Sequence, residues 1–149
     1  MTTEPSRERV MAIDYGERRI GLALSDPHFD FVSGLPTIDR AELEDSAVEE
    51  IGRIVEREGV NRLVIGIPYT LEGEEGEAAR AAREFGAELA GALGLPIDEW
   101  DERMTTGAAK RALRETGHSE REMKGKLDQL AAVLMLEAYL RRRSGEGRP

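Results

Sequence analysis

Cysteine is absent from the 149-residue sequence, and histidine occurs only twice, as His28 and His118. The lack of cysteine excludes disulfide scaffolds, thiolate zinc sites and cysteine nucleophiles, and two histidines disfavour a histidine-rich metal site. No apolar run approaches the roughly 20 residues of a membrane-spanning helix. The polar start, MTTEPSRERV, lacks the apolar segment of a secretory signal. These absences predict a cytoplasmic protein that does not enter membranes.

Acidic residues outnumber basic ones, 30 against 21, which gives a formal net charge of −9. This balance disfavours binding of nucleic acid by bulk electrostatic attraction, because such proteins present clustered basic side chains to phosphates. Lysine, however, stands only at positions 110, 124 and 126, so the basic residues are nearly all arginine. Arginine suits bidentate phosphate contacts, although a genomic preference for arginine explains the same composition.

The length fits one domain, and 40% apolar residues suffice for one core at this size. We expect a flexible leader over residues 1–8, a folded domain over residues 9–143 and a disordered tail over residues 144–149.

Apolar patterns predict five strands. Ile20, Leu22 and Leu24 alternate with small residues over Arg19–Ser25, as in a half-buried strand. The short connection before it, which contains Gly16, predicts a hairpin with a preceding strand. The other four strands are expected at Arg9–Asp14, at Phe31–Ile38 near an edge of the sheet, at Asn61–Ile67 and at Leu95–Trp100.

Helical spacing predicts four helices between and after these strands. The first three are expected from an N-cap at Asp39 to Gly59, over Ala78–Leu93, and from Thr105 or Thr106 to about Glu115. The last begins at a capping box of Ser119 and Glu122, and its apolar run Leu130–Leu136 predicts burial on several sides. The order β-β-β-α-β-α-β-α-α predicts an α/β fold, with a single mixed five-stranded sheet flanked by helices on both faces.

Acidic residues end two of the buried strands. Asp14 ends the first strand, and Asp101 and Glu102 follow the strand Leu95–Trp100. Asp128 lies on the face of the last helix that also carries small residues, by three- and four-residue spacing. Because ligands bind beyond the carboxyl ends of parallel strands, these carboxylates are expected to converge. Converging carboxylates favour a hard divalent cation, Mg²⁺ or Mn²⁺, which needs no cysteine or histidine.

Each acidic residue also has a purely structural interpretation. A single aspartate at a strand end commonly caps a turn, as Asp101 could. Glu102 could pair with Arg103, and Asp128 could face solvent. Because three acids are placed in this way in one chain, a shared metal site is retained as the alternative interpretation.

Four segments, in register along the chain, resemble one protein family. Ala12–Gly16 with Arg19–Ala23 is similar to the opening of the YqgF/RuvX family of Holliday junction resolvases, also called pre-16S rRNA nucleases. Gly66-Ile67-Pro68 with Gly73 is similar to the family's glycine-proline loop, although family members more often carry Asn where this chain has Thr70. The remaining similarities are an acid-acid-arginine block at Asp101–Thr106 and a C-terminal helix from Lys126 to Leu140.

The resemblance, which covers about Arg9 to Arg142, implies an RNase H-like fold and an acidic triad of Asp14, Glu102 and Asp128 that holds Mg²⁺ or Mn²⁺. Asp101 is the rival of Glu102, since consecutive residues of a strand point to opposite faces. Phosphate contacts are expected from Arg19, Arg103 and Lys126, for which structural ion pairs are the alternative. Substrate contacts are also expected from the loop residues Gly66, Pro68 and Gly73.

The resemblance implies a metal-dependent endonuclease that hydrolyses phosphodiester bonds in structured nucleic acid. The expected substrate is the 5′ end of precursor 16S rRNA or a Holliday junction, bound by a monomer or a homodimer. The alternative is a non-catalytic RNase H-like binding protein in rRNA processing or transcription, with ribosome or transcription proteins as partners, which the net charge of −9 favours.

Overall fold

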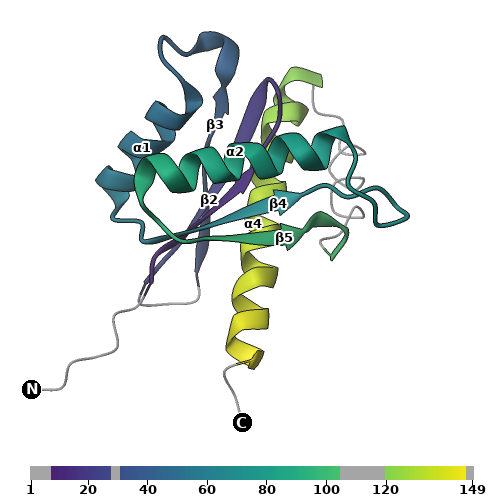
Figure 1. The fold of residues 1–149 in the computed structure, drawn as a ribbon. Coiled ribbons are helices and arrows are strands. Elements are labelled where there is room, and N and C mark those ends of the chain that lie inside the picture. The colour runs from purple at the N-terminus through teal and green to yellow at the C-terminus, as the bar shows by residue number, and fades with distance from the viewer. Residues whose placement is uncertain (1–7, 28–30, 105–119, 147–149) are drawn as a thin grey trace, which may run out of the picture.

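The structure, a computed structural model, describes residues 8–27, 31–104 and 120–146, and the side chains of the last segment over 125–144. Its strands are β1 (Val10–Asp14), β2 (Arg19–Ser25), β3 (Val32–Asp39), β4 (Arg62–Ile67) and β5 (Ile97–Asp101). Its helices are η1 (Arg40–Glu42), α1 (Ala47–Glu58), α2 (Glu77–Leu93), η2 (Glu102–Met104) and α4 (Glu120–Glu146), as Figure 1 shows. The predicted helix from Thr105 or Thr106 and the Ser119 cap lie outside the described residues.

The five strands form one mixed sheet in the order β3-β2-β1-β4-β5. β1, β2 and β3 pair antiparallel, whereas β4 and β5 continue from β1 in parallel. The predicted mixed five-stranded sheet is therefore confirmed, with β3 at an edge as expected. The parallel half brings the carboxyl ends of β1, β4 and β5 to one end of the sheet.

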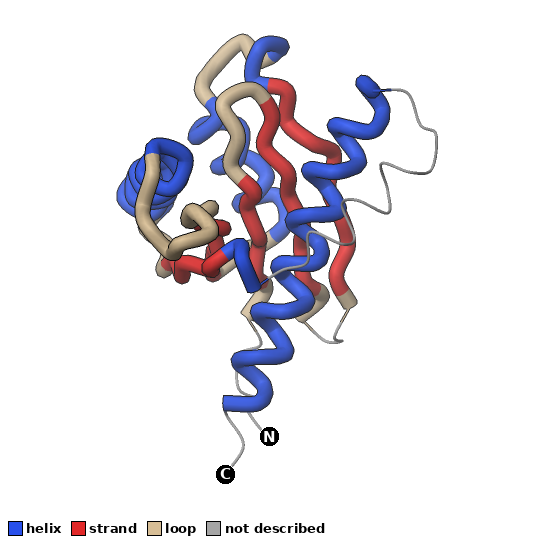
Figure 2. Tube along the Cα trace, turned by 90° about the vertical axis from the view of Figure 1, so that its right-hand side faces the viewer, coloured by secondary structure: helices blue, strands red, loops and turns tan. Residues whose placement is uncertain are grey.

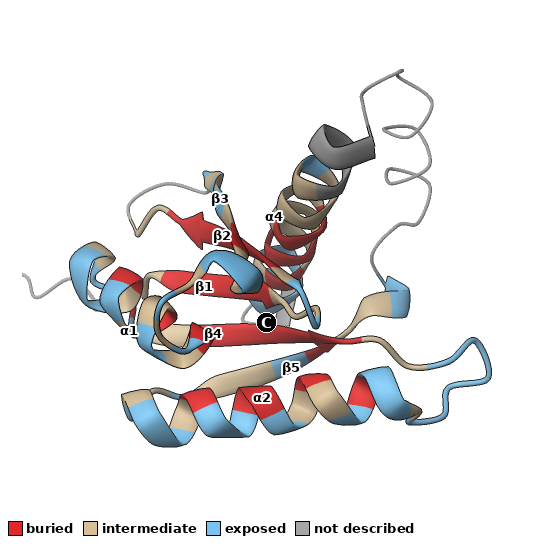
Figure 3. Cartoon of the chain, turned by 90° about the horizontal axis from the view of Figure 1, so that it is seen from above, coloured by how far each residue is buried: buried red, intermediate tan, exposed pale blue. Residues whose placement is uncertain are grey.

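Helices cover both faces of the sheet, as the sequence predicts. Helices α1 and α2 lie on one face and α4 crosses the other, an arrangement visible in Figures 2 and 3. Alternate strand residues divide between two cores: Met11 and Ile13 pack with α1 and α2, whereas Val10 and Ala12 pack under α4. Asp14, which follows in the same alternation, belongs to the α4 side.

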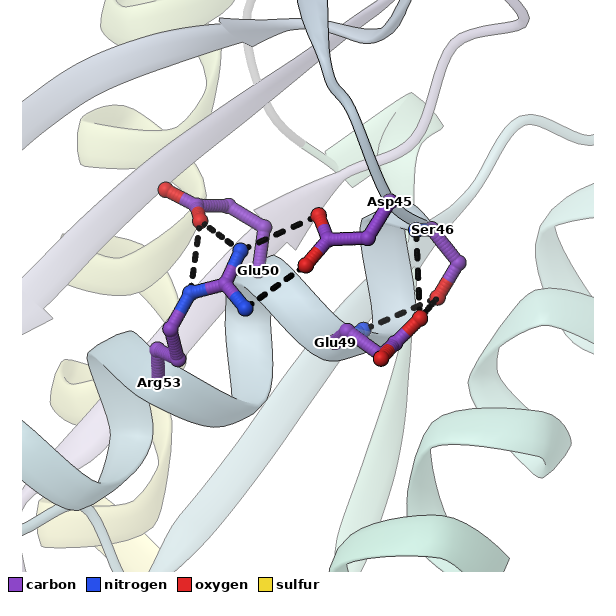
Figure 4. Close-up of polar contacts among 5 residues, drawn as sticks. All are labelled: Asp45, Ser46, Glu49, Glu50 and Arg53. Atoms are coloured by element: carbon purple, nitrogen blue, oxygen red, sulfur yellow. Dashed lines mark hydrogen bonds and ion pairs between the residues drawn. The ribbon is translucent and has the colours of Figure 1, made fainter.

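The first helix begins later than predicted. Asp39 caps only the short η1 turn, accepting from the backbone N of Ala41 at 3.1 Å. Helix α1 begins after Ser46, which forms a capping box with Glu49 (Figure 4). This box satisfies two backbone N–H groups reciprocally, and Arg53, one turn further along α1, binds Asp45. Both helices on this face end as expected, at left-handed Gly59 and Gly94.

Helix α4 differs from expectation in two ways. It is buried on the sheet-facing side, at Ala132 and Leu136, but Leu130 and Leu134 on other sides are only half-buried. The prediction of burial on several sides is wrong for the described chain, because α4 is the single described helix on its face of the sheet. It also continues to Glu146, into the segment predicted as a disordered tail. No helix in the described ranges has the length and hydropathy to cross a membrane.

Glu8, which the sequence analysis places in the flexible leader, is tied to the fold. Its carboxylate pairs with Arg62 at 2.9 Å and with Arg143 at 2.8 Å. The rest of the predicted leader, residues 1–7, and the end of the predicted tail, residues 147–149, lie outside the described residues.

Candidate active site

Asp14 ends β1 between two glycines of the neighbouring strands. It is paired with Gly21 of β2, and the parallel register of β1 with β4, which joins Ile13 to Ile65, sets Gly66 on its other side. Directly paired antiparallel residues project to the same face of a sheet. The half-buried Asp14 side chain and the two glycines therefore share the α4 face.

Glu102 lies over Gly66. A Cβ atom added to Gly66 would stand 2.5 Å from Oε2 of Glu102 and 2.8 Å from its Cγ. Gly66 is not among the glycines with positive φ, so the position requires glycine for space and not for backbone conformation. The absent side chain at Gly66 thus lets the Glu102 carboxylate rest on the sheet, on the face that carries Asp14.

Asp128 lies over Gly21 on the other side of Asp14. A Cβ atom at Gly21 would stand 2.0 Å from the backbone O of Asp128 and 3.1 Å from its Cβ. The same stretch of α4 is held by two hydrogen bonds to β3. Oγ1 of Thr37 donates to the backbone O of Gly125, and Nε2 of Gln129 donates to the backbone O of Leu35, each at 2.9 Å. The main chain at Asp128 is therefore fixed against the sheet.

The packing role of Gly21 was not predicted from the sequence. The signal was present in the alternation of Gly21, Ala23 and Ser25 along β2. Ala23 packs in one cluster with Ala132 of α4, and Ala131 beside it is also buried. A strand face and a helix face that both carry small side chains predict close backbone approach.

The row Gly21, Asp14 and Gly66 brings Glu102 and Asp128 to opposite sides of Asp14. Adjacent strands lie about 4.8 Å apart, so each outer acid is carried about one strand spacing from the central one. All three acids are half-buried. Their oxygen-only donor set fits a hard divalent cation. As the side chains stand, however, no three acidic or histidine residues in the described chain are gathered closely enough to hold a metal ion.

One of the three acids, Asp128, is paired with Arg19. Its Nε donates to Oδ2 of Asp128 at 3.2 Å, and the two side chains are 30% and 27% exposed. The Asp128 carboxylate is thus already neutralised by a cation from the protein itself.

Asp101 projects away from this row. It pairs with Ile67 in the β4–β5 register, one residue after the Gly66–Trp100 pair, and so faces the α2 side. Its carboxylate accepts from Nη2 of Arg103 at 2.6 Å and from the backbone N of Arg103 at 2.9 Å. These hydrogen bonds and the charge of Arg103 hold the pKa of Asp101 below its usual value. Asp101 therefore caps the turn that follows β5, as its purely structural interpretation predicts.

The remaining predicted substrate contacts lie along the same end of the sheet. Arg103 stacks over the ring of Tyr69 at 5.7 Å, and Gly73, with a φ of 84°, lies against the Arg103 guanidinium. Pro68 follows β4 and is half-buried, and Lys126 is exposed on α4. The Thr70 hydroxyl accepts from the backbone N of Glu74 at 3.0 Å, so it bonds within its own loop.

Comparison with known proteins gives one consistent family. The family model described as RuvX, Holliday junction resolvase, matches residues 8–142. A protein of Pelotomaculum thermopropionicum named "Putative pre-16S rRNA nuclease" is 40% identical over 141 residues, covering 95% of this chain and 90% of that protein. A protein of the same name from Chloroflexus aurantiacus is 40% identical over 140 residues, covering 93% and 91%.

Solved structures agree on the fold. RuvC of T. thermophilus in complex with a Holliday junction substrate aligns with a TM-score of 0.56 at 14% identity, covering 95% of this chain and 99% of that one. The Holliday junction resolvase of fowlpox virus aligns with a TM-score of 0.50 at 11% identity, covering 91% and 99%. The predicted RNase H-like fold and the predicted family are confirmed, and the chain belongs to the RuvX family of nucleases.

Proposed function

We propose that this chain is a divalent-metal-dependent endonuclease for structured nucleic acid, acting on precursor 16S rRNA or on Holliday junctions. The observation that carries the proposal is the row at the end of β1, in which Asp14 stands between Gly66, covered by Glu102, and Gly21, covered by Asp128. Two positions without side chains leave room for two carboxylates beside a third. Packing alone gives no reason to collect acids on the small-residue face of a sheet.

In this proposal Asp14, Glu102 and Asp128 hold the metal, and Asp14 has the central place. Bound Mg²⁺ or Mn²⁺ supplies an acidified water and neutralises charge on the phosphate. The protein contributes fixed positions, because strand β1 carries Asp14 and the seated helix α4 carries Asp128. Asp101 is outside the proposed triad, since its carboxylate is engaged by Arg103 on the other side of β5.

The proposed phosphate contacts come from Arg19, Arg103 and Lys126. Arg103 is 41% exposed at its side chain although it binds Asp101, so donors of its guanidinium remain near the surface. Gly66 near the end of β4 and the loop residues Pro68 and Gly73 border the same end of the sheet and are proposed to contact the substrate. Arginine is suited to the phosphate part because its planar guanidinium binds two oxygens at once.

The test is cleavage by the purified chain with Mg²⁺ or Mn²⁺, offered precursor 16S rRNA fragments and four-way DNA junctions. We expect Asp14→Asn and Glu102→Gln to slow cleavage by at least about 100-fold, a barrier increase of about 2.7 kcal/mol. Asp101→Asn is the matched control, and we expect cleavage within a few-fold of wild type.

Equal cleavage by wild type and Asp14→Asn would overturn the proposed catalytic role of Asp14, and absence of cleavage by wild type would favour the non-catalytic binding protein. A loss with Asp101→Asn and none with Glu102→Gln would exchange the two acids. The two substrates in the same assay decide between RNA and branched DNA. Ribosome or transcription partners, a monomer or homodimer, and a cytoplasmic location remain predictions, and co-purification and sedimentation would test the first two.

A further inference from the structure

Arg19 occupies the carboxylate that the proposed function assigns to the metal. The guanidinium reaches Asp128 across 109 residues of sequence and donates from Nε to Oδ2 at 3.2 Å. Arg19 stands on the α4 face of β2, two residues before the glycine on which Asp128 rests. Arg19 and a bound divalent cation would therefore compete for the same group, the Asp128 carboxylate.

The main chains that carry the pair are held by packing and hydrogen bonds, whereas the two side chains are partly exposed. Helix α4 is seated on Gly21 and held by Thr37 and Gln129, and Arg19 belongs to a strand paired on both sides. Both side chains are about 30% exposed. An ion pair of this exposure contributes only about two- to fivefold to an equilibrium constant. A divalent cation at the carboxylates can displace it.

A displaced Arg19 has a second acceptor nearby. Asp39 lies opposite Arg19 in the β2–β3 ladder, and its present ion pair, with Arg18, is long at 3.4 Å. After release from Asp128, the Arg19 guanidinium would therefore still have an acidic side chain, that of Asp39, beside it.

We propose that Arg19 is a built-in competitor of the metal: it neutralises Asp128 in the metal-free protein and is displaced from that carboxylate when the divalent cation binds. This proposal rests on the proposed function, since it takes Asp128 as a metal ligand. It makes Arg19 a positioning residue that lowers metal affinity while keeping the acidic row intact without metal.

A merely structural role for Arg19 gives the opposite sign. If the guanidinium braced Asp128 in the orientation that the metal needs, removing it would weaken metal binding. If Arg19 competes, removing it strengthens metal binding. The direction of the change in affinity therefore separates the two roles without any measurement of cleavage.

The experiment is a titration of the full chain with Mn²⁺, followed by the electron paramagnetic resonance signal of free Mn²⁺, without nucleic acid. We expect Arg19→Gln to bind Mn²⁺ about two- to fivefold more tightly than wild type. Arg19→Met keeps the apolar stem, should show the same gain and replaces the Gln variant if that one does not fold. Arg19→Lys keeps the charge and should stay near wild type.

Two controls tie the effect to the pair. Arg57→Gln removes an arginine of α1 that pairs with Glu58 on the opposite face of the sheet, and should leave Mn²⁺ affinity unchanged. In an Asp128→Asn background, Arg19→Gln should no longer tighten binding. If Arg19→Gln and Arg19→Met both bind Mn²⁺ no more tightly than wild type, the proposed competition is overturned. The proposed function still stands in that case, provided that wild type binds Mn²⁺. Absence of Mn²⁺ binding to wild type overturns both.

Discussion

The two faces of the sheet are built from the same strands but from different kinds of residue. The face under α1 and α2 collects large aliphatic side chains that are fully buried, among them Ile13, Leu22 and Ile65. The face under α4 carries Ala12, Ala23 and two glycines, and at its carboxyl end the acids. One face therefore supplies most of the large apolar burial, and the other gives up side-chain volume so that carboxylates and a helix backbone can approach the sheet.

Removing volume from the aliphatic face should give the largest effect on stability. Leu22→Ala empties a position with no exposed surface, and such substitutions typically lower the free energy of unfolding by about 2–5 kcal/mol. Urea denaturation measures this change. Mn²⁺ affinity of the folded protein should stay near wild type, because Leu22 faces away from the acids. A loss below about 1 kcal/mol would contradict the division of the faces.

Adding volume to the α4 face should damage the site more than the fold. Gly66→Ala places a methyl 2.5 Å from the Glu102 carboxylate, which must move, and a displacement of about 1 Å in a catalytic group can cost 100-fold in rate. We expect a loss of cleavage of this order in the assay above, with less destabilisation in urea than for Leu22→Ala.

Gly86→Ala in α2 is the matched control for that glycine. Its added Cβ meets Ile65 at 3.1 Å on the opposite face of the sheet, so it should leave cleavage near wild type whatever it does to stability. Equal loss of cleavage in the two variants would remove the distinction between the faces.

A smaller effect concerns the far end of the α4 face at high pH. Burial, a hydrogen bond to Asp98 and the charge of Asp98 raise the pKa of Tyr139 from 10.0 to about 12. The folded state binds the phenol proton of Tyr139 more strongly than the unfolded state does. The resulting contribution of Tyr139 to the free energy of unfolding is complete below pH 10 and is lost as the pH rises toward 12. The melting temperature of wild type should therefore fall over this range more steeply than that of Tyr139→Phe. Parallel curves would show that Tyr139 titrates alike in both states.

The strands and their order could be predicted because period-two patterns such as Ile20, Leu22 and Leu24 report burial directly. Errors arose where two local signals competed. Asp39 is a good cap, but it caps a single η1 turn, and the Ser46 box begins the helix. The apolar run of α4 is similar on several sides, whereas the described sheet offers it one surface.

The sequence supplies the acids of the candidate site but not their arrangement in space. Asp14 was singled out by its position at a strand end, and Asp128 by the face of the helix that carries it. That Asp128 lies over the glycine next to Asp14 depends on a tertiary contact, which no local pattern reports. The choice between Asp101 and Glu102 depends on the turn into η2, which puts one carboxylate on Arg103 and the other on Gly66. The pair of Arg19 with Asp128 joins residues too distant in sequence for any local pattern to indicate it.

The seat of α4 on β2 has a practical consequence. Its tightest contact at Gly21 is made by the carbonyl oxygen of residue 128, an atom that every amino acid possesses. The contact of α4 with Gly21 therefore requires no particular side chain at position 128, whereas the proposed metal site does. A different donor atom or a spectroscopic reporter introduced at position 128 would therefore probe the proposed metal site while the contact of α4 with the sheet is kept.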